Sequence, residues 1–271
     1  LAPAQEHIQQ AADKLQHVRT DDIPEPQRGR IAEVQQSLPR LAASFQTFLS
    51  FSDVLLAVLG HESPQRYVFI FQNNRELRPT GGFIGSIALM DIDEGIIDNL
   101  EVPGGGIYDL AGQLSKKIIA PKPLWLVNPH WNIQDSNWFP DFPTSAQKLM
   151  WFYERAGRTT VDGVISMTPT VVERLLAIVG PIDMPGYDIE VTDDNFVYQA
   201  QYWAEIGYDR EENKPKQFIA DLMPKLMQEI FSAEPQQAVS MLDALYTSMQ
   251  QRDVLMYFTD EQGQAAMQEL V

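Results

Sequence analysis

A long apolar run that ends in a glycine-rich loop carrying two arginines is the feature that most constrains this fold. Residues 67–71 read Tyr-Val-Phe-Ile-Phe, a continuous apolar run that is typical of a buried strand. Residues 72–82 are polar, and a second apolar run begins at Phe83. Arg75 and Arg78 are therefore expected at the end of a core strand, where open α/β sheets bind ligands.

The loop has the composition of an anion site, and phosphate is the first expectation. Arginine and glycine-loop amides both suit anions. Arg78 precedes a proline and should be extended, and the N–H groups of Thr80, Gly81 and Gly82 could approach a ligand oxygen. The alternative is a structural turn whose arginines pair with Glu76 or a carbonyl group. The string matches neither the P-loop nor the dinucleotide fingerprint.

Composition narrows the class of protein. The chain has 271 residues, 44% of them hydrophobic, which is enough for a sizeable core. Its net charge of −17 argues against nucleic acid or an anionic membrane surface as the main partner. The absence of cysteine excludes disulfides, thiol nucleophiles and thiolate metal sites. No apolar run reaches the roughly 20 residues that cross a bilayer.

The pattern along the chain predicts one α/β domain, a mixed β-sheet flanked by helices, preceded by a helical N-terminal segment. Residues 1–60 are expected to form a helical pair or stalk, broken near residues 21–26 by two prolines. The α/β domain is expected over residues 64–271. Its clearest units are a hairpin within residues 83–102 and a strand–helix unit over residues 161–181.

Two further segments carry candidate site residues. Residues 131–143 hold Asp135 and Asp141 among bulky aromatics, and oxygen-rich side chains at such spacing can bind Mg²⁺ together with substrate phosphate. The alternative is an ordered loop whose aromatics fill the core and whose carboxylates cap turns. Arg210, Lys214 and Lys216 form the only basic cluster in the acidic half of the chain, and they could equally be a solvated helix start.

The string from Phe71 to Ser86 resembles the signature of a bacterial family, domain-of-unknown-function family 4012. Further matching pieces lie at residues 107–110, 135–138, 140–143, 161–165 and 180–181. The resemblance implies an extracytoplasmic part of a membrane-anchored protein. The anchor would lie in a segment absent from this chain, which by itself is expected to be soluble.

More distantly, the order of elements is similar to that of the LytR-CpsA-Psr cell-wall phosphotransferase family. That similarity implies transfer of a polymer from a polyprenyl-pyrophosphate carrier, with Mg²⁺ at the pyrophosphate and an apolar tunnel for the lipid. It implies catalytic roles for Arg78, Asp109 and Asp141, and a metal site at Asp135 and Asp141. It implies ligand binding by Arg75, Thr80, Gly81, Gly82, Lys214, Lys216 and Gln217. The sequence departs from that family at Thr80, where the family places an aspartate.

Two functions follow as hypotheses. The first is an extracytoplasmic cell-envelope protein that binds a polyprenyl-(pyro)phosphate-linked or other phosphorylated glycan precursor and transfers it to the cell wall. The alternative is a non-catalytic envelope module that binds a partner through the aromatic loop 125–142, since exposed aromatics make good anchors. A deep apolar tunnel beside Arg78 would favour the first hypothesis. A closed core with Trp131 and Trp138 exposed would favour the second.

Overall fold

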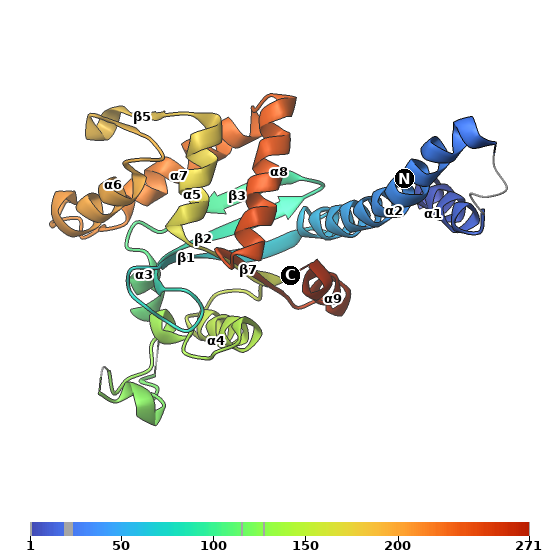
Figure 1. Ribbon diagram of the computed structural model, residues 1–271. Helices are drawn as coiled ribbons and strands as arrows, with labels where there is room; N and C mark the ends of the chain where they lie inside the picture. The colour runs from blue at the N-terminus through green and yellow to red at the C-terminus, as the bar shows by residue number, and fades with distance from the viewer. Residues whose placement is uncertain (1, 19–23, 115, 127, 271) are drawn as a thin grey trace.

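The computed structural model describes residues 2–18, 24–114, 116–126 and 128–270 (Figure 1). The described residues form a five-stranded mixed sheet, ordered β3-β2-β1-β4-β7, with helices on both faces and a helical segment at the N-terminus. Both the predicted fold class and the N-terminal helical segment are confirmed. No helix in the described ranges is long and apolar enough to cross a membrane.

The strands of the main sheet are β1 (Gln65–Asn73), β2 (Phe83–Asp93), β3 (Ile96–Glu101), β4 (Gly163–Met167) and β7 (Val254–Phe258). A second small sheet pairs β5 (Ile182–Met184) with β6 (Ile189–Val191). The helices are α1 (Ala2–Gln16), α2 (Glu25–Val58), α3 (Ile107–Ala111), α4 (Phe142–Arg155), α5 (Pro169–Val179), α6 (Phe196–Tyr202), α7 (Gln217–Phe231), α8 (Pro235–Gln250) and α9 (Glu261–Leu270).

The central strand β1 is apolar throughout because it is covered on both sides. Val68 and Ile70 pack into the cluster that contains α4, whereas Tyr67 packs with residues of β4, α8 and β7 on the other face. Strands buried on both faces read as continuous rather than alternating apolar runs. Strands β1 and β4 run parallel, and the other neighbouring strands of this sheet run antiparallel.

The predicted local units are present. Strands β2 and β3 form a hairpin whose turn places Glu94 and Gly95 at positive φ. The unit over residues 161–181 is β4 followed by α5, which ends at Gly180 with a φ of 93°. Helix α1 packs against α2, and α2 packs against α9. Residues 19–23, where part of the proline break was expected, lie outside the described ranges.

Candidate functional site

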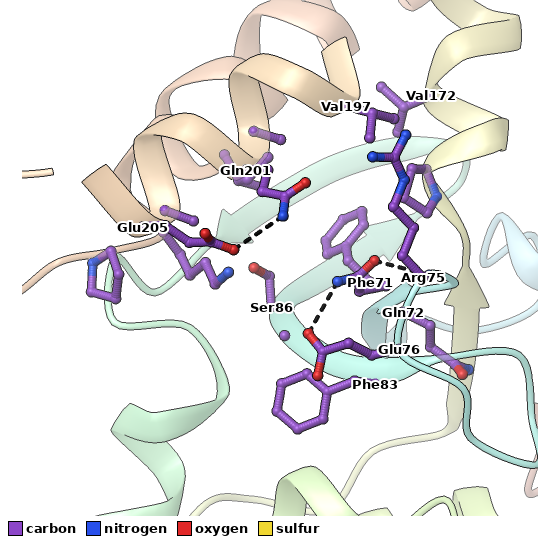
Figure 2. A pocket seen from close by; sticks show the side chains of 18 of the residues that line it. Phe71, Gln72, Arg75, Glu76, Phe83, Ser86, Val172, Val197, Gln201 and Glu205 are labelled. Atoms are coloured by element: carbon purple, nitrogen blue, oxygen red, sulfur yellow. Dashed lines mark hydrogen bonds between the residues drawn. The ribbon is translucent and has the colours of Figure 1, made fainter. Parts of the chain in front are cut away.

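A pocket of about 320 Å³ lies at the carboxyl end of β1, where the parallel neighbour β4 also ends (Figure 2). The chain after β1, the first turns of α5 and α7, and helix α6 supply its walls. Its charged side chains are Arg75, Glu76, Glu205 and Lys216, and Ser86 adds a hydroxyl group. We call this the polar pocket. It occupies the edge of the sheet at which open α/β folds bind ligands.

Lys216 is held in the polar pocket by a backbone hydrogen bond and by close contacts along its side chain. Its backbone N–H donates to Gly104 O at 2.7 Å, just before α7 begins. Its stem runs past Gly106, where a Cβ would lie 2.8 Å from Lys216 Cγ, and its Nζ lies over Gly85. The two glycines leave the lysine the space that it occupies.

The ammonium group of Lys216 makes no hydrogen bond or ion pair with any residue that the structure describes. Burial lowers the pKa of Lys216 below its ordinary value of 10.5, and the negative charges of Glu205 and Glu76 oppose that shift. A partly desolvated cation without a partner is a group that an anionic ligand would stabilise.

Arg75 and Glu76 come from the loop after β1 and lie at the same pocket (Figure 2). The Asn73 side chain orders this loop: its Nδ2 donates to Glu76 Oε1 at 3.1 Å, and its Oδ1 accepts from Arg75 N at 3.1 Å. Across the pocket, Gln201 Nε2 donates to Glu205 Oε1 at 3.2 Å. Two cations and two carboxylates therefore face one small space.

Arg78 lies elsewhere, although it was expected at the mouth of the site. Its guanidinium group sits over the rings of Phe83 and Trp138, 5.1 Å and 5.5 Å from their centres, and donates to Leu77 O at 2.9 Å. Arg78 lines neither the polar pocket nor the apolar cavity described below. Its contacts hold the loop against its neighbours, so Arg75 and Lys216 take its place in the candidate site.

A buried hydrogen-bond network beneath the loop uses the polar residues of the opening motif. Asn137 Nδ2 faces three acceptors: Thr80 Oγ1 at 2.9 Å, Gln72 Oε1 at 3.2 Å and Gly82 O at 2.8 Å. Thr80 Oγ1 in turn donates to Gln72 Oε1 at 3.1 Å. The network joins residues 131–143 to β1, which gives Thr80 a structural role.

The glycine amides are also engaged within the protein. Gly81 N donates to Arg78 O at 3.0 Å, and Gly82 N donates to Gln72 Oε1 at 2.9 Å. A Cβ on Gly82 would lie 2.3 Å from Asn73 O, so the close approach that requires glycine is to the protein's own backbone. In this arrangement neither amide is free to bind phosphate, which corrects the expectation for Gly81 and Gly82.

The three aspartates proposed for catalysis or metal binding have separate positions. Asp141 caps α4 by accepting from Thr144 N at 2.8 Å, and this hydrogen bonding lowers the pKa of Asp141. Asp109 accepts from Gly105 N at 3.1 Å. Burial raises the pKa of Asp135, and the charge of Arg78 opposes that rise.

These aspartates do not fit a Mg²⁺ site. Within the described ranges no group of three or more His, Asp or Glu side chains could hold a metal ion. Asp141 is committed to a helix cap, and Asp135 is buried in a setting that disfavours its charge. No step of the function proposed below runs through a metal.

Only one member of the predicted basic cluster reaches the polar pocket. Lys214 is exposed and pairs with Glu212 at 3.0 Å, and Gln217 Nε2 donates to Asp221 Oδ1 at 2.7 Å. Lys214 and Gln217 line a separate hollow of about 260 Å³. Arg210 lines neither space.

A larger cavity of about 470 Å³ lies between the sheet and helices α5, α7 and α8. Its lining is almost entirely apolar and includes eight of the ten methionines of the chain. Those methionines are Met90, Met167, Met223, Met227, Met241, Met249, Met256 and Met267. Methionine side chains are flexible and adapt to irregular apolar shapes. We call this the apolar cavity; it is the feature that sequence reasoning could not locate.

The aromatic residues of the loop 125–142 divide into two groups. Trp131 packs edge-on against Phe152 at 5.5 Å and donates from Nε1 to Asp135 O at 2.8 Å, so it supports the core. Trp138 lies beneath Arg78. Trp125 and Leu126 are exposed, at 52% and 98%. Residue 127 lies outside the described ranges. The contact surface expected over 125–142 is thus narrowed to the Trp125–Leu126 pair.

Comparison with known proteins places the sequence in a family. The family model described as "Protein of unknown function (DUF4012)" matches residues 62–202, more than half of the chain. This agrees with the resemblance seen in the motif from Phe71 to Ser86. No curated protein matches significantly.

Several solved structures share a similar arrangement at low identity. Bacillus subtilis TagV is 11% identical with a TM-score of 0.42, the match covering 76% of this chain and 79% of TagV. Lin1025 from Listeria innocua is 13% identical with a TM-score of 0.42, covering 76% and 78%. The protein gbs0355 from Streptococcus agalactiae is 11% identical with a TM-score of 0.44, covering 76% and 72%. Likeness at this level does not bear on function.

Proposed function

Because the chain belongs to the DUF4012 family, whose function is unknown, its role has to be inferred from its own site. We propose that it binds an amphiphile with a phosphorylated head and a long apolar tail, namely a polyprenyl-(pyro)phosphate-linked glycan precursor of the cell envelope. The single observation that carries the proposal is that the two spaces are adjacent and share lining residues. Phe71 and Met223 line both the polar pocket and the apolar cavity.

The polar pocket suits the head of such a ligand. Lys216 supplies a cation without a partner, and Arg75 supplies a guanidinium group that can hold two phosphate oxygens at once. The Ser86 hydroxyl can donate a third hydrogen bond. Glu76 and Glu205 balance the two cations, so the pocket favours a head of low negative charge over a highly charged one.

The apolar cavity suits the tail. Among the described residues that line it, Arg174 is the only charged one, so the cavity offers little to a polar ligand. Arg174 is itself engaged, since its Nη1 donates to Asp253 Oδ2 at 3.0 Å and to Ser248 Oγ at 2.6 Å. Burying a prenyl chain there would remove about 0.8 kcal/mol of unfavourable hydration per CH₂ group.

The wider role follows from the ligand. A glycan on a prenyl carrier is bound to the membrane, and the proposed transfer to the cell wall takes place outside the cytoplasm. We therefore propose that the protein acts there, attached to the membrane through a segment absent from this chain. Transfer to a cell-wall acceptor is the second part of the proposal. The acceptor oxygen would form a bond to the glycan-linked phosphorus of the pyrophosphate, and the P–O bond to the prenyl phosphate would break, so that prenyl phosphate leaves. Glu76 or Glu205 would accept the proton of the acceptor hydroxyl.

The test is a calorimetric titration with a short, water-soluble prenyl phosphate, compared with the corresponding prenyl alcohol. We expect binding of the phosphate, and weaker binding of the alcohol. Lys216→Ala should weaken phosphate binding about tenfold or more, which is the usual effect of losing a charged hydrogen bond. Lys214→Ala is the matched control, because Lys214 lies two residues away, outside the polar pocket. Equal binding by both variants would overturn the assignment of the head site.

The non-catalytic envelope module remains a second candidate because Trp125 and Leu126 are exposed. A protein of that kind would bind its partner through this pair and would not need the cavities. This second candidate would be favoured if no prenyl phosphate bound and if a substitution of Trp125 abolished binding of a partner.

A further inference from the structure

The loop over residues 116–126 carries exposed apolar side chains at its tip. Ile119 is 75% exposed, Trp125 is 52% exposed and Leu126 is 98% exposed. Figure 1 shows this part of the chain, in green, extending away from the sheet and from α4. Apolar side chains gathered at a protruding tip mark a site of interaction.

The exposure is built into an ordered structure. Ile119 forms an antiparallel bridge with His130, and Ala120 N donates to Pro129 O at 3.0 Å. Between them a 3₁₀ turn, Lys122–Leu124, tucks Leu124 inward to 2% exposure. Trp125 Nε1 donates to Ala120 O, which fixes the indole ring on its own loop. The loop therefore buries some apolar residues and presents others.

The charge of the loop is opposite to that of the rest of the protein. Between Asp109 and Asp135 the sequence contains three lysines and no acidic residue, within a chain of net charge −17. Lys116, Lys117 and Lys122 are exposed, and none forms a hydrogen bond or ion pair with a residue in the described ranges. Three exposed cations therefore lie on the same loop as the exposed apolar side chains.

We propose that this loop is a membrane-docking element that inserts Trp125 and Leu126 among the headgroups of an anionic lipid bilayer. Tryptophan favours the membrane interface, and flanking lysines bind anionic headgroups while their stems cover apolar surface. A bilayer yields around a narrow convex tip, whereas a protein partner needs a broad complementary surface. The proposal goes beyond the ligand site and does not depend on it.

The net negative charge of the whole chain does not prevent this contact. Charges more than about 8 Å apart are largely screened at physiological ionic strength. A protruding loop can therefore attract an anionic surface while the acidic body stays beyond that distance.

Co-sedimentation with phosphatidylcholine vesicles, with and without phosphatidylglycerol, tests the proposal. The vesicles contain no prenyl lipid, so the ligand site does not contribute. We expect binding that requires phosphatidylglycerol and weakens with salt. Replacing Lys116, Lys117 and Lys122 with glutamine should lower the partition coefficient about fivefold per lysine. Trp125→Ser with Leu126→Ser should lower it about tenfold or more.

Two controls make the result specific to the loop. Ile96→Ser with Val239→Ser removes two side chains of similar exposure, 65% and 67%, from other surfaces and should leave binding unchanged. With brominated lipids, quenching of tryptophan fluorescence should be seen in the wild type and largely lost in Trp125→Phe, which can still insert. Absence of vesicle binding, or binding that the loop variants retain, would overturn the proposal and leave the tip as a surface for a protein.

Discussion

Phe71 in β1 and Met223 in α7 each line both the polar pocket and the apolar cavity, so the two residues form the boundary at which these spaces meet. On one side of that boundary lie Lys216 and Arg75, and on the other lie methionines and aliphatic side chains. One ligand with a charged head and an apolar tail would fill both spaces.

The apolar cavity should determine which tail length binds. Ala88 in β2 is 2% exposed and lines this cavity, so Ala88→Leu adds volume where space exists. We expect the variant to keep its stability and to bind short prenyl phosphates while losing long ones. Competition between prenyl phosphates of increasing length, measured by calorimetry, checks this.

Ala146→Leu is the matched control for that variant. Ala146 is 1% exposed in the α4 cluster and lines neither cavity. The same substitution there should cost about 1–3 kcal/mol of stability through overpacking and leave the preference for tail length unchanged. If Ala88→Leu destabilises the protein just as much, the cavity is not available space.

The carboxylates of the polar pocket should weaken the binding of a phosphate. Glu205→Gln removes one negative charge near Lys216 and keeps the hydrogen-bonding shape of the side chain. We expect up to about fivefold tighter binding of a prenyl phosphate, the range of a solvent-accessible charge interaction. Glu190→Gln, on β6, is exposed and outside the pocket, and its affinity should match the wild type. Weaker binding in Glu205→Gln would instead mean that the carboxylate contacts the ligand directly.

Binding should fall at alkaline pH because Lys216 must carry a proton. Burial lowers the pKa of Lys216 below 10.5, so the free protein loses this charge at a lower pH than an ordinary lysine does. Phosphate stabilises the protonated form, so affinity is full below the lowered pKa and declines as pH rises through it. Titrations across the alkaline range measure this decline.

Lys216→Arg isolates the titrating group, since arginine stays charged over the same range. The variant should bind with little change across alkaline pH. A decline as steep as that of the wild type would assign the pH dependence to another residue.

The network beneath the loop should stabilise the fold without taking part in binding. Asn137 is 1% exposed, and removing its side chain leaves the buried acceptors Gln72 Oε1 and Gly82 O without that donor. Asn137→Ala should cost about 1–3 kcal/mol in the free energy of urea unfolding. Asn74→Ala, at an exposed position of the same loop, should stay within about 0.5 kcal/mol of the wild type. Near-equal stabilities would show that the network contributes little.

The architecture could be predicted where local pattern and tertiary environment agree. The run over residues 67–71 is a strand because helices cover both of its faces, and the unit over 161–181 carries its own start and stop signals. No element was predicted for residues 254–258, although they read Val-Leu-Met-Tyr-Phe, and the structure forms strand β7 there. Its position beside β4 depends on contacts far apart in the sequence.

The candidate site could be predicted only in part. Arg75 and Lys216 were both named from the sequence, but so was Arg78, and composition cannot tell which arginine of a loop faces a pocket. The Arg78 guanidinium group lies over the rings of Phe83 and Trp138, and these contacts keep it out of the pocket. Glu76 and Glu205 were not proposed as site residues. Glu205 reaches the pocket from the π-helical turn Trp203–Gly207, which is far from the opening loop in the sequence.

The apolar cavity had one sequence signal that was not used. The chain has ten methionines, and most of them lie in β2, β4, β7 and the helices that cover one face of the sheet. A high content of methionine in a chain without cysteine is consistent with an adaptable apolar surface. Their convergence on one cavity required the fold.

The most direct test is photo-crosslinking with a prenyl phosphate that carries a diazirine near the end of its tail, followed by mapping of the labelled peptides by mass spectrometry. The account predicts labelling within α7 and α8, at residues such as Met227, Met241 and Met249, and competition by an unlabelled prenyl phosphate. Labelling confined to the loop over 116–126 or to the N-terminal helices, or labelling that no competitor reduces, would contradict it.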